Sequence, residues 1–365
     1  MVSIMKSTQG IHRSPVRTGR LVRPGMAVAQ PPTVELDART GYDFLACACA
    51  VCGELDDILA EDRSWLVQGR AALEQELGPD PRVDACGGFV TEVGRLIVAQ
   101  PAIRTARDVV DAIDGLSDRD LIELIVGELL EDPELAGITR KAVDGDEGAF
   151  ESLQARLEST KGHTVMAGTI TELAPTTRQV ARFWLPRYEK IEDRVRHMLE
   201  RDAAELRGED TGVDPFAFVE HATNGIRLVA EQRTRRIVLA PTYFGRPYNS
   251  MSHVGDTELI YYPIADTSLG SADRLTPPNS TVRLYRALGD ESRLRILKLL
   301  AERDRYLTEI ANALDLSKPT VKHHLAVLRS AGLTTVTEQG NMTYYTLRRD
   351  RAEEAGPELR GFLVR

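Results

Sequence analysis

The chain has 365 residues, of which 42% are hydrophobic and 28% charged, the composition of a folded protein with enough material for two or three hydrophobic cores. Only 5% of the residues are aromatic, so the cores should consist mainly of Leu, Val, Ile and Ala, which favours helices over β-sandwiches. The sequence has no apolar run long enough to cross a membrane and no secretory signal. Because four cysteines are too few for a disulfide framework, a reduced, cytoplasmic protein without a membrane partner is expected.

The net charge of −9 is distributed unevenly. Residues 279–365 hold 15 Lys and Arg against 11 Asp and Glu, and residues 1–24 hold five basic residues and no acid. The remaining residues hold 26 basic and 44 acidic side chains, a net charge of −18. A polyanion is therefore expected to bind an end of the chain, because the acidic middle would repel it.

The N-terminal segment, residues 1–32, is rich in Arg, Pro, Gly and Ser and lacks a hydrophobic period. This composition predicts a disordered basic tail. A DNA-contacting arm is the alternative, although basic tails are common.

Residues 33–270 are predicted to form a mostly helical domain that receives a signal or builds a dimer. Pro186 should end or kink the helix predicted over residues 176–207. Two β-like runs, residues 236–240 and 258–263, could pair with each other. The helices predicted from apolar periodicity and from breakers cover residues 42–59, 64–77, 85–99, 104–113, 118–130, 149–159, 176–207 and 215–232.

Residues 271–280 contain two prolines among polar neighbours and are the predicted linker. Residues 281–350 follow with the element order of a winged helix-turn-helix, and residues 351–365 are expected to be a C-terminal tail. The predicted helices cover residues 281–288, 291–300, 307–314 and 318–330, and the predicted wing strands cover 333–338 and 343–347. The fold is therefore predicted to be mainly α, an N-terminal helical regulatory domain joined to a winged helix with a small β-hairpin.

The fourth helix of this domain indicates its own orientation. At 100° per residue, Val321, Leu325 and Leu328 share one face and should point into the core, and His324 lies at the edge of that face. The opposite face combines small residues with hydrogen-bond donors near its N-terminal end, which suits insertion into a major groove. The predicted helix caps are Asp290 and Ser317. The candidate DNA contacts of this helix and the wing are Lys318, Pro319, Thr320, Lys322, His323, Arg329, Gln339 and Asn341.

Three segments of the C-terminal domain together resemble the ArsR family of winged-helix repressors: residues 288–297, 316–333 and 344–347. The match extends over roughly 70 residues in the same element order, which is more specific than one short motif. The resemblance implies a homodimer that binds double-stranded DNA at a palindromic operator and releases it on receiving a signal. It also implies DNA-reading roles for Lys318, Thr320, Lys322 and His323.

The sequence departs from the family in two places. The wing tip has Gln339 and Asn341 where the family usually has Arg or Lys, which predicts a weak grip on phosphate. Metal-sensing members carry Cys or His in the third or a final helix, but residues 307–314 and the segment after Arg348 contain neither. A metal sensor of the familiar kind is therefore not expected.

Four cysteines cluster early in the sequence: Cys47, Cys49, Cys52 and Cys86. A thiolate site would use Cys49, Cys52 and Cys86 with a fourth ligand from elsewhere. The surrounding segment, residues 44–52, is apolar on all sides, which is typical of a buried helix in which free Cys packs as a small hydrophobe. Packing is the favoured interpretation.

The sequence contains no phosphate loop, zinc-protease motif, nucleophile elbow or ligand-spaced His, Asp and Glu cluster. We therefore expect no catalytic residue, no cofactor and no enzyme activity, and the partners expected are double-stranded DNA, a second copy of the chain and an unidentified small-molecule effector. Two rival functions stay open: an architectural protein of the nucleoid, and a small-molecule enzyme fused to a DNA-binding domain.

Overall fold

The computed structural model describes residues 31–49, 55–77, 87–160, 170–209, 214–228, 234–270, 277–339 and 342–364. The chain divides into Met1–Gln30 and Pro31–Arg365, and the account below concerns the second unit. All but two residues of the predicted basic tail lie outside the described residues. None of the helices in the described ranges is long and apolar enough to span a lipid bilayer.

The described residues between 31 and 270, here called the body, contain a four-stranded sheet of order β1-β3-β5-β4. The strands are β1 (Thr33–Leu36), β3 (Arg236–Thr242), β4 (Ser250–Val254) and β5 (Thr257–Pro263). The predicted pairing of the two late runs is confirmed, in parallel orientation with Arg236 opposite Thr257. β1 also pairs in parallel with β3, and β4 is antiparallel to β5.

The sheet corrects the prediction that the fold is mainly α. β1 has four residues and β4 has five, which is too short for a period of two to stand out from the surrounding sequence. Their pairing depends on partners about 200 residues away for β1 and on the β5 hairpin for β4. The body is therefore an α/β domain in which helices cover a mixed sheet.

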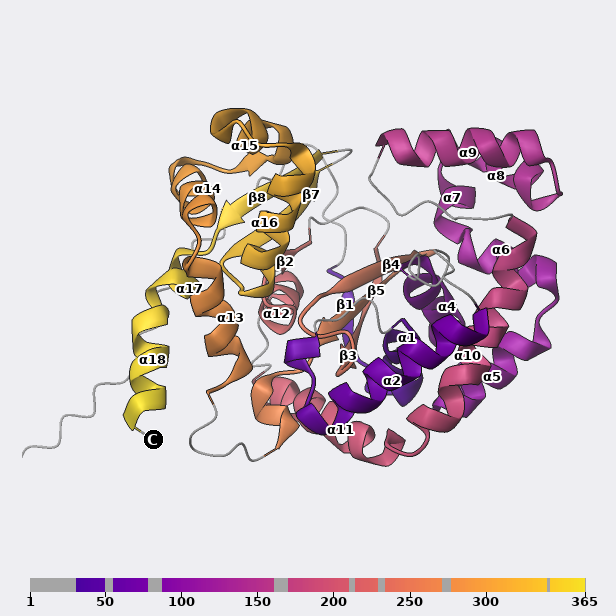
Figure 1. Cartoon of the computed structure of the whole chain (residues 1–365), viewed down its shortest axis with the longest axis horizontal. Helices are drawn as coiled ribbons and strands as arrows, with labels where there is room; N and C mark the ends of the chain where they lie inside the picture. The colour runs from indigo at the N-terminus through magenta and orange to yellow at the C-terminus, as the bar shows by residue number, and fades with distance from the viewer. Residues whose placement is uncertain are drawn as a thin grey trace, which may run out of the picture. The chain divides into compact units, whose positions relative to one another are not determined.

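Most predicted helices of the body are present, with shifted ends (Figure 1). Pro186 lies in the last turn of α10, which stops at Tyr188 before α11 begins, so the predicted interruption is confirmed. The helices expected over residues 42–59 and 215–232 are shorter than predicted, ending at Ala48 and Ala222. The bounds are α1 (Thr40–Ala48), α2 (Ala60–Leu77), α4 (Gly87–Ala99), α5 (Ala106–Gly115), α6 (Asp118–Ile125), α7 (Gly127–Glu131), α8 (Ala136–Val143), α9 (Glu147–Thr160), α10 (Leu173–Tyr188), α11 (Glu192–Glu209) and α12 (Pro215–Ala222), with short 3₁₀ turns at Leu55–Asp57, Ile170–Glu172 and Asp266–Leu269.

The two faces of the body sheet pack into different cores because side chains alternate along a strand. Val238 and Ala240 of β3 join the large core formed with α1, α4 and α10. Ile237 and Leu239 of the same strand join a smaller core with Phe218 of α12. Both faces are buried, which explains why β3 and β5 read as continuous apolar runs.

The C-terminal domain has the predicted winged-helix order, and α15 (Leu307–Leu314) and α16 (Lys318–Ser330) have the predicted bounds. The segment expected to be a tail is instead largely helical, because α18 packs against α13. The remaining elements are α13 (Asn279–Leu288), α14 (Glu291–Glu302), β6 (Arg305–Tyr306), β7 (Thr334–Gln339), β8 (Met342–Leu347), α17 (Arg349–Glu353) and α18 (Ala355–Val364).

The wing sheet includes a strand from the body. Its order is β2-β7-β8-β6, and β2 (Ile226–Arg227) pairs in parallel with β7, Ile226 opposite Val336. Beside this pairing, the Arg348 guanidinium donates to the Asn224 side chain at 2.7 Å. Gly332 has φ +72 and contacts Asn224 so closely that a Cβ there would lie 2.7 Å from the amide nitrogen.

Asp43 of α1 ties the helices of the body to the end of β3. Its carboxylate is fully buried and accepts the backbone N–H of Tyr243 at 2.6 Å and of Phe244 at 2.9 Å. The Tyr188 hydroxyl of α10 donates to the other oxygen at 2.9 Å. Burial raises the pKa of Asp43 to about 7, although these hydrogen bonds oppose the shift.

The raised pKa predicts a pH dependence of stability. The carboxyl of the unfolded chain titrates near pH 4. Asp43 therefore makes its full contribution to the free energy of unfolding below about pH 4. This contribution falls by at most about 4 kcal/mol as the pH rises to about 7. In Asp43→Asn the amide oxygen still accepts both N–H groups and the amide nitrogen can donate to the Tyr188 hydroxyl, whose proton can go to the Thr40 carbonyl at 3.3 Å. Urea denaturation across this pH range should show a flatter stability profile for Asp43→Asn than for the unmodified chain.

A matched Asp43→Ala variant should lose several kcal/mol at every pH, since it leaves the buried N–H groups of Tyr243 and Phe244 without their acceptor. An unchanged pH profile in the Asn variant would show that another group titrates in its place.

Candidate nucleic-acid interface

The helix-turn-helix is formed by α15, a short connection and α16. Asp315, directly after α15, adopts φ 54 in the left-handed region and reverses the chain. Ser317 then caps α16 as predicted, its hydroxyl accepting the backbone N–H of Thr320 at 3.3 Å. Pro319 lies in the first turn, where its missing N–H costs nothing. These local signals fix where α16 begins.

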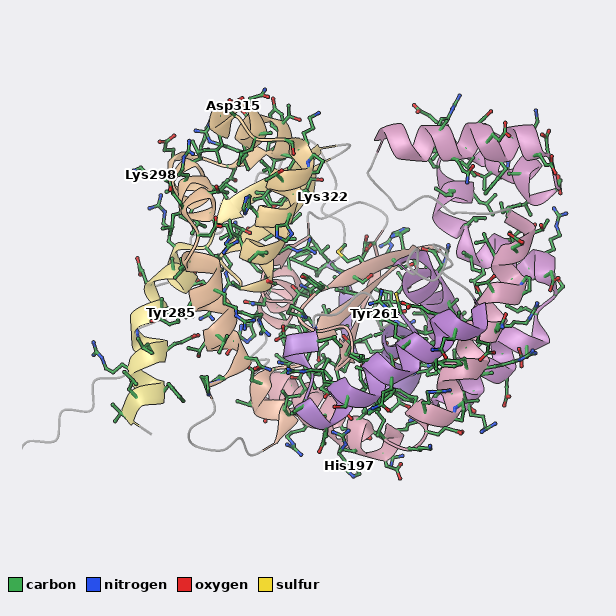
Figure 2. The ribbon with its side chains drawn as sticks, viewed as in Figure 1. His197, Tyr261, Tyr285, Lys298, Asp315 and Lys322 are labelled. Atoms are coloured by element: carbon green, nitrogen blue, oxygen red, sulfur yellow. The ribbon has the colours of Figure 1, made fainter. Side chains whose placement is uncertain are left out.

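The apolar stripe of α16 points into the core as predicted. Val321, Leu325 and Leu328 are each no more than 1% exposed and pack with α13, α14 and α15. The opposite side of the first two turns is open to solvent, where it presents two ammonium groups, a hydroxyl and an imidazole. This exposed set, called the recognition face below, consists of Lys318, Pro319, Thr320, Lys322 and His323, with Lys322 marked in Figure 2.

The other candidate contacts lie elsewhere. Arg329 is half-buried near the C-terminal end of α16, away from the first turns. Gln339 is the last residue of β7, and Asn341 lies outside the described residues. His324 is half-buried, with its Nδ1 3.9 Å from the Asp290 carboxylate. The recognition face is therefore a compact cluster at one end of α16.

Asp290 caps α14 as predicted, accepting the backbone N–H of Arg293 at 2.9 Å. This hydrogen bond lowers the pKa of the Asp290 carboxyl. The Arg293 side chain turns back to donate to the Ala287 carbonyl at 2.9 Å, at the end of α13. Asp290 and Arg293 together link the end of α13 to the start of α14.

Cys49 is not available as a ligand of the possible thiolate site. Cys47 is a buried free thiol whose pKa is raised by burial. Cys49 is also buried but disulfide-bonded, so the expectation that it packs as a free thiol is wrong. Cys52 and Cys86 lie outside the described residues. Sulfur in a disulfide is no longer the thiolate that binds metal, and no group of metal-binding side chains occurs in the described ranges.

The attachment of the body to the wing was not predicted. Asn224-Gly225 lies in a segment that was assigned to the helix over residues 215–232, yet both residues have positive φ, 52 and 121. An Asn-Gly pair is a strong turn signal and would have placed the helix end correctly. The pairing of β2 with β7 has no such signal, because two residues are too few for a recognisable pattern.

Comparison with known proteins agrees with the winged helix. The model of bacterial regulatory proteins of the arsR family matches residues 290–335. An uncharacterised HTH-type transcriptional regulator of Methanocaldococcus jannaschii is 38% identical over 72 residues, which are 20% of this chain and 81% of that protein. The arsenical resistance operon repressor of Escherichia coli K12 is 39% identical over 67 residues, 18% of this chain and 57% of the repressor. The transcriptional repressor SdpR of Bacillus subtilis is 34% identical over 64 residues, 18% of this chain and 71% of SdpR.

The recognition face yields a prediction about DNA. Replacing Lys322 and His323 together with Ala should weaken DNA binding by about 1–3 kcal/mol per lost base contact and relax sequence preference. Lys298→Ala, at an exposed position of α14, is the control and should bind as the unmodified chain does. Ser317→Ala should only loosen the start of α16, by about 1 kcal/mol. Equal affinities of the double variant and the control in a gel-shift titration would show that α16 does not read DNA through this face.

Proposed function

This chain belongs to the ArsR family of bacterial regulatory proteins, and from this premise we propose that it is a sequence-specific transcriptional regulator that represses promoters in the cytoplasm. The observation that carries the proposal is the recognition face of α16, exposed at the start of a correctly capped second helix of a helix-turn-helix. Such a helix places its N-terminal residues against base edges in the major groove. The relatives named above are regulators, and we propose no catalytic activity.

We propose that the regulator acts as a homodimer on a palindromic operator. An excess of four positive charges in residues 279–365 is small for tight binding of DNA by one copy. The winged helix also exposes apolar side chains that a second copy would cover: in α18, Leu359 is 37%, Leu363 71% and Val364 80% exposed, and Tyr285 of the neighbouring α13 is 38% exposed. Clustered exposed apolar groups support an interface.

We also propose that the body receives the signal. The contacts that join it to the winged helix include the pairing of β2 with β7 and a buried ionic cluster. In that cluster Asp57 pairs with Arg283 of α13, and Asp266 pairs with Arg246 and accepts the backbone N–H of Ser280 at 2.6 Å. A change in the body therefore has a direct physical route to the DNA-binding helices.

The dimer proposal predicts a solution behaviour and an operator symmetry. Light scattering should give the mass of two chains, and a footprint on the promoter of the protein's own gene should reveal an inverted repeat with half-sites about one helical turn apart. Leu359→Asp with Leu363→Asp should raise the dimer dissociation constant about tenfold or more. Val67→Asp, which alters a body side chain 49% exposed on α2, should leave the dimer intact.

A monomer protecting an asymmetric site would contradict the dimer. Equal affinity for operator and random DNA would instead favour an architectural protein.

The ionic cluster predicts a large loss of stability when one partner is removed. Among the described residues, Arg283→Gln leaves the Asp57 carboxylate, 1% exposed, with Arg246 at 4.0 Å as its remaining ion-pair partner. Breaking a buried pair in this way costs about 3–5 kcal/mol. Adding Asp57→Asn should recover much of this loss, because the unpaired charge is then gone. Urea denaturation measures the loss in Arg283→Gln and the recovery in the double variant, with exposed Arg295→Gln as the control. If Arg283→Gln were as stable as the control, the cluster would not hold α13 to the body.

A further inference from the structure

The hairpin formed by β7 and β8, here called the wing hairpin, carries no cation of its own. Its residues, 334–347, include no Lys or Arg and one acid, Glu338. Contacts between cationic side chains and phosphates supply much of the affinity of a protein for DNA. If the wing hairpin lies against DNA, the cation that binds phosphate there must come from a neighbouring element.

The wing hairpin extends to the level of the recognition face. Gly332, with φ +72, reverses the chain directly after α16, and β7 then contacts α16 (Figure 1). β7 has six residues and α16 has 13, and at about 3.3 Å and 1.5 Å per residue both are about 20 Å long. DNA that contacts the first turns of α16 therefore also passes the end of β7.

β2 of the body places Arg227 beside this end of the wing hairpin. β2 runs parallel to β7, and Arg227 lies opposite Thr337, two residues before β7 ends. Thr337 in turn lies opposite Tyr344 of β8. Residues that lie opposite one another project from the same face of a sheet. Because the next residue, Tyr345, packs against the core of the winged helix, Arg227 projects from the outer face.

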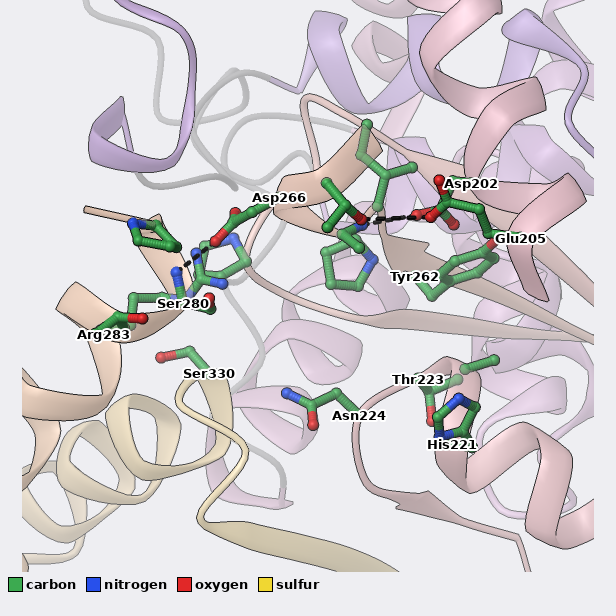
Figure 3. A pocket seen from close by; sticks show the side chains of 18 of the residues that line it. Asp202, Glu205, His221, Thr223, Asn224, Tyr262, Asp266, Ser280, Arg283 and Ser330 are labelled. Carbon is green, nitrogen blue, oxygen red and sulfur yellow. Dashed lines mark hydrogen bonds between the residues drawn. The ribbon is translucent and has the colours of Figure 1, made fainter. Parts of the chain in front are cut away.

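The turn before β2 fixes the position of this strand. The hydroxyl of buried Thr223 accepts the N–H of Ile226 at 3.0 Å, and the carbonyl of Thr223 accepts the side-chain amide of Asn249 at 2.9 Å. Asn224 is bound by Arg348 of the winged helix. Figure 3 shows Thr223 and Asn224 in this turn. A residue on a strand held in this way loses little backbone freedom when it binds a ligand.

The Arg227 side chain is open to a ligand. It is 42% exposed and pairs at 2.8 Å with Glu220 of α12, which is 29% exposed. An ion pair in contact with water is weak, so phosphate can replace the carboxylate at little cost. Arg305 and Arg348, which also adjoin the wing sheet, are 14% and 20% exposed and donate to the Leu299 carbonyl and to Asn224.

We propose that Arg227 is a phosphate-binding residue that the body contributes to the DNA interface, in place of the cation that the wing hairpin lacks. Glu220 competes with phosphate for the Arg227 guanidinium and so opposes DNA binding. The inference rests on the proposed function, because it requires that α16 binds DNA. It goes beyond that function by making the body part of the surface that contacts DNA.

The test is the salt dependence of DNA binding by the full chain, measured by fluorescence anisotropy. The probes are a duplex from the promoter of the protein's own gene and a duplex of random sequence. Each phosphate contact contributes about 0.9 to the slope of log affinity against log salt concentration. Over a tenfold rise in salt, the unmodified chain should therefore lose about eightfold more affinity than Arg227→Gln. At low salt Arg227→Gln should weaken binding to both duplexes by the same factor, since phosphates carry no sequence information.

Glu220→Gln supplies a test in the opposite direction. It frees Arg227 from its competitor, so it should bind both duplexes more tightly than the unmodified chain at low salt. The matched controls are Arg107→Gln and Glu189→Gln, which break a similarly exposed ion pair between α5 and α10 of the body. Both controls should bind DNA with the affinity and salt dependence of the unmodified chain.

The proposal is overturned if Arg227→Gln has the salt dependence of Arg107→Gln, or if Glu220→Gln binds no more tightly than Glu189→Gln. It is also overturned if Arg227→Gln weakens binding to the promoter duplex alone, which would indicate a base contact. If the Lys322 and His323 double variant loses affinity but Arg227→Gln does not, this inference fails and the proposed function stands. If the unmodified chain binds neither duplex, both fail.

Discussion

The arrangement of the two domains depends on one buried ionic cluster, formed by Asp57, Arg246, Asp266 and Arg283. Three of these side chains come from the body and one from α13, the first helix of the winged helix. Charges removed from water are costly unless they are paired, so these side chains must stay beside one another, and this fixes where α13 lies against the body. Asp266 also helps to orient α13, because it accepts the N–H of Ser280 at the start of that helix.

Buried carboxylates also hold elements of the body against one another. Asp43 binds the backbone just after β3, and Asp202 binds the backbone just after β5, in each case from a neighbouring helix. Backbone N–H groups just beyond the end of a strand no longer pair with a neighbouring strand, and a carboxylate supplies the acceptors that they lack. The carboxyl edge of the sheet is therefore shaped by side chains.

The sequence predicted features that depend on neighbouring residues better than features that depend on residues far apart in the chain. The winged helix was predictable because its signals are local. Asp290 and Ser317 mark where helices begin, and the apolar stripe of α16 repeats at helical spacing. The body was harder. β1 pairs with β3 across about 200 residues, and the partners that hold Asp57 and Asp202 become visible only in three dimensions. On the recognition face the sequence indicated which side chains are exposed, but no pattern could reveal that Arg227 lies beside β7.

The pairing of β2 with β7 has a consequence for the independence of the domains. A strand at the border of a sheet presents free backbone donors and acceptors that invite pairing with other chains. Here the body occupies part of that border, and Asn224 and Arg348 close the space beside Gly332. If the winged helix were cut away at the linker, the backbone groups of Val336 and Thr337 would lose their partners and lie open at the edge of its sheet.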